Sequence, residues 1–159
     1  MNKIFLFLSL LIFYHSASAL EGECFFEEVY KNGDMQFGKV WYQNKNLRYQ
    51  YSNKNLFTII KNKQGTFIIN NNNLVFREYE DSNFIAELNN IIAKKPYVDG
   101  VYYNKEAKFV IERQNDDREL IKRISINSSQ LNLSIYFKDC IKSKVDDRYF
   151  KHSPFFKSN

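Results

Sequence analysis

The side chains with the most chemical potential in this sequence are His152 and the two cysteines, Cys24 and Cys140. A serine hydrolase needs a base and an orienting acid within hydrogen-bond reach of its nucleophile. His152 stands in a short C-terminal tail beside Ser153, and no nucleophile motif accompanies it. The other histidine, His15, lies in a segment that we expect to be removed. We therefore predict that the protein is not an enzyme and has no catalytic residue.

The acidic residues do not form a metal-binding pattern. Asp116-Asp117 and Asp146-Asp147 are adjacent pairs in predicted turns, where carboxylates are ordinarily solvated. Metal sites need clustered histidine, cysteine or acidic ligands at characteristic spacings, and none occurs here. The five glycines are scattered as turn residues and form no phosphate-binding loop. We predict neither a metal nor a cofactor.

The N-terminus has the three parts of a signal peptide. Lys3 supplies the positive charge, residues 4–14 form an apolar run, and Ala17-Ser18-Ala19 gives the small-x-small cleavage pattern. The apolar run has 11 residues, whereas a membrane span needs roughly 20. We expect residues 1–19 to be cleaved and residues 20–159 to work outside the cytoplasm as one soluble domain.

Cys24 and Cys140 are predicted to reach a compartment that permits disulfides. A bridge would join the first strand to one of the last, and two unpaired buried thiols are the alternative. Lipid attachment at Cys24 is not expected. Glu21, Gly22 and Glu23 precede it, where a lipobox has an apolar residue followed by small ones. The mature chain is therefore expected to diffuse freely.

The basic charge does not predict a nucleic-acid partner. The formal net charge is +5, and it falls to +4 without residues 1–19, which contain one lysine and no acidic residue. Basic residues among aromatic ones can stack nucleic-acid bases, and 17% of the residues are aromatic. The charge is spread along the chain, however, and secretion argues against such a partner. We expect a monomer that binds no nucleic acid.

Most of the mature region is predicted to form short antiparallel strands, because apolar and polar residues alternate between turn signals such as Asn32-Gly33. In one strand the alternation places Leu47, Tyr49 and Tyr51 on the same face. The first six strands are predicted at 23–30, 35–42, 47–51, 56–61, 66–70 and 74–79. Four more are predicted at 97–103, 109–113, 120–126 and 131–137. Consecutive short strands indicate a meander rather than βαβ units.

One amphipathic helix interrupts the strands at about residues 84–93. Its apolar residues recur at helical spacing, and they are Phe84, Ile85, Leu88, Ile91 and Ile92. One helix can bury only part of the apolar face of a sheet of nine or ten strands. The predicted fold class is therefore mainly β (α+β), with a strongly curved antiparallel sheet or incomplete β-barrel and a helix covering an apolar concave face. An ordinary packed β-core is the alternative.

Several segments resemble the LolA-like family of periplasmic outer-membrane lipoprotein carriers. Gly-Lys-Val-Trp-Tyr at 38–42 and Arg-Tyr-Gln-Tyr at 48–51 are similar to the family's Gly-x-hydrophobic-aromatic and Arg-aromatic-x-Tyr strands. Residues 56–70 look like the hairpin that follows, and the helix at 84–93 falls where a helix plugs the family's cavity. Residues 145–150 are similar to the closing Asp-x-x-Phe segment.

The resemblance spans about residues 23–155, with three departures. The first predicted strand begins almost at the cleavage site, where the family usually has a helix. Asn44-Lys45 replaces an Arg-Pro pair, and the C-terminal half looks short by about one hairpin. We therefore assign no residue the family's role of an arginine that latches the helices over an empty cavity.

The resemblance implies that residues 20–159 are one lipoprotein-carrier domain. Such a carrier would take acylated lipoproteins from an inner-membrane exporter to an outer-membrane receptor and would need no cofactor. The residues expected to line its acyl cavity are Trp41, Leu47, Tyr49, Leu56, Phe67, Phe76, Phe84, Leu88 and Ile92. One alternative is a secreted β-domain that acts as an envelope sensor or protein-interaction module without lipid cargo. Another is a small secreted enzyme built around His152.

Overall fold

The structure of the protein is a computed structural model, which describes residues 21–79, 99–103, 107–117, 120–129 and 131–151. Strands dominate these residues, and the helical element among them is η1, a 3-10 turn at Asp147–Phe150. The ten strands form one antiparallel sheet that does not close. The predicted mainly β, antiparallel class is therefore confirmed.

Some of the sequence predictions concern residues outside these ranges. The signal peptide at 1–19, the helix at 84–93 and His152 lie outside the described residues, and the covering helix is therefore not shown. Within the described ranges, no helix is long and apolar enough to cross a membrane.

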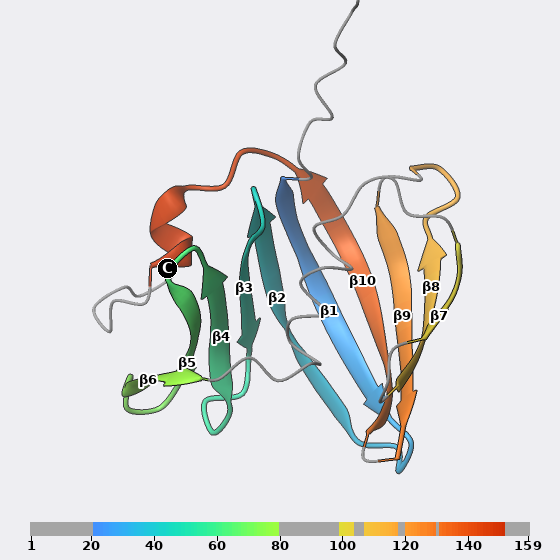
Figure 1. The fold of residues 1–159 in the computed structure, drawn as a ribbon, viewed down its shortest axis with the longest axis horizontal. Coiled ribbons are helices and arrows are strands. Elements are labelled where there is room, and N and C mark those ends of the chain that lie inside the picture. Colours follow the sequence, from blue (N-terminus) through green and yellow to red (C-terminus); the bar gives the residue numbers. More distant parts are fainter. Residues whose placement is uncertain (1–20, 80–98, 104–106, 118–119, 130, 152–159) are drawn as a thin grey trace, which may run out of the picture.

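The strands follow one another along the chain as a meander. They are β1 (Gly22–Tyr30), β2 (Met35–Gln43), β3 (Asn46–Tyr51), β4 (Phe57–Asn62), β5 (Gly65–Asn70), β6 (Phe76–Tyr79), β7 (Gly100–Tyr103), β8 (Ala107–Arg113), β9 (Ile121–Ser128) and β10 (Asn132–Lys142). Their order across the sheet is β6-β5-β4-β3-β2-β1-β10-β9-β8-β7, so β6 and β7 are the two edges. Strand direction changes across the sheet, and β6 lies at a steep angle to β4 (Figure 1).

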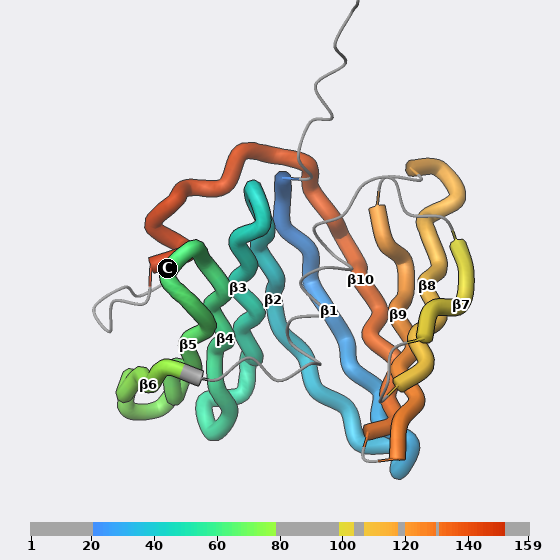
Figure 2. Tube along the Cα trace, viewed as in Figure 1, coloured from blue at the N-terminus to red at the C-terminus, as the bar shows by residue number. Residues whose placement is uncertain are grey.

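The first and the last strands of the chain pair at the centre of the sheet. Every other pairing joins strands that are consecutive in sequence. The β1–β10 pairing therefore connects one meander, β1 to β6, with a second, β7 to β10, and Figure 2 shows the two strands side by side along their length. In this register Phe26 lies opposite Phe137, and Glu28 lies opposite Ile135.

The turn between β2 and β3 has a backbone conformation that excludes proline. Asn44 and Lys45 both have positive φ, at 51° and 69°, and they connect the directly paired residues Gln43 and Asn46. Positive φ at both central residues is the signature of a type I′ hairpin turn. Proline cannot adopt it, because its ring holds φ near about −65°. An Arg-Pro pair would therefore not fit this turn.

The alternation of side chains divides the sheet into two faces. We call the face that carries the largest buried cluster the core face, and the other the back face. The core-face cluster takes side chains from β1–β4 and β8–β10, among them Phe26, Val40, Tyr49, Ile59, Phe109, Ile111, Ile124, Ile126, Leu133, Ile135 and Phe137. Two smaller clusters form around Trp41 and Ile60. Apolar burial is thus concentrated on one face.

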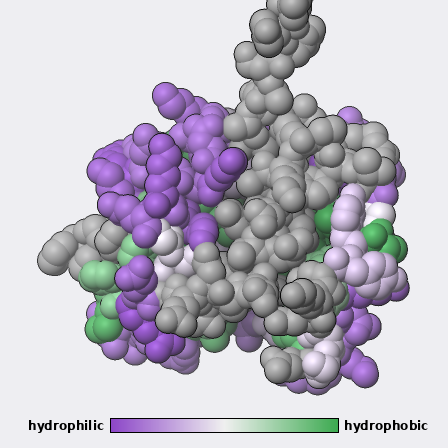
Figure 3. All heavy atoms as spheres, viewed as in Figure 1, coloured by the Kyte–Doolittle hydropathy of each residue, from purple (hydrophilic) through white to green (hydrophobic). Residues whose placement is uncertain are grey.

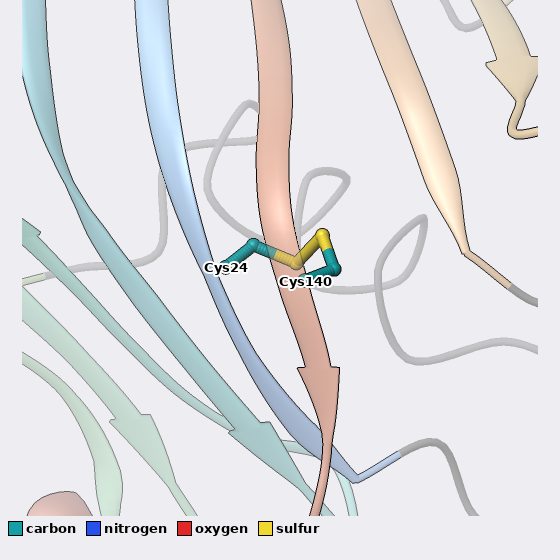
Figure 4. Close-up of a disulfide and its surroundings, with 2 residues drawn as sticks. All are labelled: Cys24 and Cys140. Atoms are coloured by element: carbon teal, nitrogen blue, oxygen red, sulfur yellow. A yellow bond between two sulfur atoms is a disulfide. The ribbon is translucent and has the colours of Figure 1, made fainter.

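A disulfide joins Cys24 of β1 to Cys140 of β10 (Figure 4). It lies where the β1–β10 register shifts, between the pairs Glu23–Ile141 and Phe25–Lys138. The shift gives β10 one residue more than β1, which is a β-bulge. The bond therefore fastens the pairing that joins the two meanders, near one end of both strands.

Replacing both cysteines by serine is expected to lower the free energy of unfolding by roughly 2–4 kcal/mol, because the disulfide closes a loop that spans most of the chain. Urea denaturation of the double variant and of the oxidised wild type measures the difference. Reduced wild type should match the variant. Equal stability of all three proteins would contradict a stabilising bond.

Candidate ligand-binding site

Three of the residues predicted to line an acyl cavity lie on the core face. Leu47 and Tyr49 are each 1% exposed within the core-face cluster, and Leu56 is partly buried against it. Both buried residues belong to β3, between β2 and β4 at the middle of the first meander. The strand alternation predicted at residues 47–51 therefore holds in the structure.

Trp41, Phe67 and Phe76 lie on the back face, so the structure separates the predicted lining into two sets. Phe67 is buried in a back-face cluster with Ile60 and Ile69. Phe76 lies directly opposite Ile69 and is 43% exposed. The remaining predicted residues are Phe84, Leu88 and Ile92, which lie outside the described residues. No single surface of the described residues collects the six strand residues of the prediction.

Trp41 packs against the C-terminal segment. Its ring stacks on Tyr149, with ring centroids 5.1 Å apart, and the Arg48 guanidinium lies 5.9 Å from the Trp41 ring centroid. Gln43 accepts a hydrogen bond from the Val145 backbone N–H at 2.7 Å. Burial lowers the pKa of Arg48 to about 10, so this side chain stays protonated at neutral pH. These contacts hold residues 145–150 against the back face.

Glu28 is the main polar feature of the core face, and sequence reasoning missed it. Its side chain is 2% exposed, yet it accepts hydrogen bonds from three tyrosine hydroxyls. Tyr49 donates to Oε1 at 2.7 Å, and Tyr30 donates to Oε2 at 2.7 Å. The Tyr51 hydroxyl lies 3.1 Å from both oxygens. A buried carboxylate is costly unless it is hydrogen-bonded, and these donors satisfy it.

The tyrosines of this cluster are held in place by neighbouring rings. Phe26 stacks on Tyr49 with centroids 3.9 Å apart and meets Tyr51 edge-on at 5.5 Å. Burial, followed by the negative charge of Glu28, raises the pKa of Tyr49 and of Tyr51. Burial and the hydrogen bond to Glu28 also raise the pKa of Tyr30. All three hydroxyls therefore keep their protons well above neutral pH.

The sequence does contain a signal for this cluster. Phe26, Glu28 and Tyr30 are spaced by two residues, so a strand places all three on one face. An acidic residue between two aromatic residues of a buried face needs hydrogen-bond donors. Tyr49 and Tyr51 have the same spacing two strands away. The sequence alone, however, does not show that β1 and β3 flank the same strand.

Two pockets share part of their lining, and the smaller one lies beside this cluster. The smaller has a volume of about 180 Å³ and is lined by Tyr30, Asp34, Gln36, Tyr51, Leu56 and Phe57. The larger has a volume of about 330 Å³ and is lined by Asn55, Leu56, Phe57, Ile68, Asn70, Asn73, Val75 and Arg77. Leu56 and Phe57 belong to both linings, so they form a shared apolar wall. Both pockets are open to solvent.

The back face carries exposed apolar side chains at the centre of the sheet. Phe25, Phe37, Met35 and Ile141 are between 44% and 55% exposed. Lys39 lies over the Phe25 ring at 5.2 Å. Exposed apolar residues also occur at the two edge strands and beside them, where Figure 3 shows hydrophobic colour. We refer to Phe25, Phe37, Met35 and Ile141 as the back-face patch.

Neither metal chemistry nor similarity to known proteins assigns this site. The described residues contain no group of three or more histidine, cysteine or acidic residues that could hold a metal ion. No protein-family model matches the chain, and a search of curated proteins finds no match. A function for this protein must therefore be inferred from its own sequence and geometry.

Replacing Glu28 by glutamine is expected to lower the free energy of unfolding by roughly 1–3 kcal/mol, because the amide NH₂ would face hydroxyl donors in a buried site. Urea denaturation measures the loss. Glu27→Gln is the matched control, because Glu27 is the neighbouring acid on the opposite face and forms a surface ion pair with Lys138. Its loss should be about 1 kcal/mol or less. Equal losses would contradict a special role for the Glu28 cluster.

The stability should fall at alkaline pH. Raised tyrosine pKa values in the folded state give stability that is complete below the unfolded pKa of about 10 and is lost as pH rises towards the folded values. Tyr49 and Tyr51 should each contribute up to roughly 1.4 kcal/mol per pH unit above about pH 10. Urea denaturation at increasing pH, with tyrosinate absorbance, measures the slope. Tyr49→Phe should reduce it, and an unchanged slope would contradict the prediction.

Proposed function

We propose that the protein is a periplasmic carrier that binds the acyl chains of lipid-modified proteins against the core face of its sheet. In this proposal the sheet is an incomplete barrel, and the helix predicted at residues 84–93 covers its concave face. The observation that carries the proposal is the pair of open pockets that share the wall of Leu56 and Phe57 at the margin of an apolar face.

The apolar side chains around these pockets suit a hydrocarbon chain. Leu56 and Phe57 are partly buried against the core-face cluster, and Ile68 extends the apolar wall into the larger pocket. Each methylene that leaves water for such a surface contributes about 0.8 kcal/mol. An acyl chain of many methylenes therefore gains enough binding free energy to stay bound during transit. A more apolar site on another protein can still bind it more tightly.

The cellular part of the proposal rests on the N-terminal sequence and on the family resemblance. A cleaved signal peptide at residues 1–19 would deliver the chain to the periplasm. There an inner-membrane exporter would load acylated lipoproteins, and an outer-membrane receptor would accept them. The binding step uses burial alone, so no catalytic group takes part in it.

The back-face patch supports a second candidate function. Four apolar side chains on three neighbouring central strands are about half exposed on the same face, and exposed apolar surface can mark an interaction site. A secreted β-domain with such a surface would serve as an envelope sensor or protein-interaction module without lipid cargo. The two candidates use opposite faces of the same sheet, so variants can separate them.

Leu56→Glu should weaken binding of a fluorescent fatty-acyl probe by roughly tenfold or more, because it places a charge on the shared apolar wall. Fluorescence titration of the mature chain measures this affinity. Phe37→Glu is the matched control on the back face and should bind as wild type does. Mass spectrometry of lipid extracts should find co-purified lipid in wild type. A protein that contains no co-purified lipid and does not bind the probe would support the interaction module.

A further inference from the structure

The smaller pocket combines aromatic walls with negative charge. Tyr51 and Phe57 meet edge-on with ring centroids 5.2 Å apart, and Tyr30 lines the same space. Asp34 stands at its exposed rim, and the Glu28 carboxylate lies behind the tyrosines. An acyl chain does not use either acidic side chain, so this smaller pocket also suits a cationic group.

The hydrogen-bond donors that the structure gives the Glu28 carboxyl group are neutral tyrosine hydroxyls. In the part of the chain that the structure describes, no lysine or arginine forms an ion pair with it. Three hydroxyl donors lower the cost of burying a carboxylate without adding a positive charge beside it. A cation in the adjoining pocket would be attracted through a medium that screens less than water does.

The tyrosine rings are already oriented for such a cation. The Tyr30 and Tyr51 hydroxyls are tied to Glu28, which holds the outer ends of the two side chains in place beside the pocket. A phenol that donates to a carboxylate also gains electron density in its ring, which strengthens attraction to a cation at the ring face. Preorganised walls reduce the entropy lost on binding.

We infer that this pocket binds an alkylammonium group, such as the head of choline or ethanolamine, either free or carried by a lipid. The rings of Tyr30, Tyr51 and Phe57 surround the cation, and Asp34 and Glu28 supply the compensating charge. The inference does not depend on the proposed carrier function, because a free cation can occupy the pocket without any acyl chain.

The first test compares choline with 3,3-dimethyl-1-butanol, a neutral molecule of nearly the same shape. Isothermal titration of the oxidised mature chain should show binding of choline and markedly weaker binding of the neutral analogue. Equal affinities would show that charge is not recognised, and no binding of choline would leave the pocket without its ligand. Either result overturns the inference.

The second test uses two phenylalanine-to-leucine variants. Phe57→Leu removes one wall of the pocket and should weaken choline binding roughly 2- to 30-fold, the range expected for one cation–π contact. Phe37→Leu makes the same change on the back face and should bind choline as wild type does. Asp34→Asn should weaken binding roughly twofold to fivefold, since Asp34 is an exposed charge. Circular dichroism confirms that the variants fold. Unchanged affinity of both Phe57→Leu and Asp34→Asn overturns the inference.

A competition experiment identifies the source of the ammonium group. Monomeric dihexanoylphosphatidylcholine that displaces choline shows that the pocket accepts a lipid headgroup, and failure to displace it shows that the pocket takes free cations. Both results support the inference. Binding of the fluorescent fatty-acyl probe tests the carrier function separately, so the two proposals can fail independently.

Discussion

The pairing of β1 with β10 is the constraint on which the rest of the structure depends. It is the one connection between two meanders that otherwise pair only with their own neighbours in sequence. The core-face cluster extends across it, with Phe26 opposite Phe137 and Glu28 opposite Ile135. The disulfide lies at one end of the same pairing. Without this pairing the core-face cluster would be divided between two separate sheets.

The Glu28 cluster adds a polar element to a mainly apolar face. A carboxylate at this position requires hydrogen-bond donors from β3, and β2 lies between β1 and β3. At the pair of Phe26 and Gly38, an added side chain would meet the Phe26 ring, so the missing side chain of Gly38 gives that ring its space. Polar and steric requirements therefore select the same register among these strands.

Much of the sheet could be predicted from the sequence, since the strands alternate clearly and turn residues separate them. Which face each aromatic residue occupies was harder to predict. Val40, Trp41 and Tyr42 are consecutive and apolar, so alternation alone does not determine the face of Trp41. The structure buries Trp41 under residues 145–150, a contact about a hundred residues away in sequence that no local pattern indicates. The partners of Glu28 depend on strand order in the same way.

The central position of β1 has a consequence for how the molecule is made. A ribosome synthesises β1 first and β10 last of the strands. One edge of β1 can pair with β2 early, but the other edge has no partner until β10 has been made. During that interval β1 presents an open hydrogen-bonding edge, which is a template for association with other chains. The two cysteines allow one pairing only, so oxidation cannot select a wrong bridge within the chain. Oxidation can, however, lock the β1–β10 pairing after β10 has been synthesised.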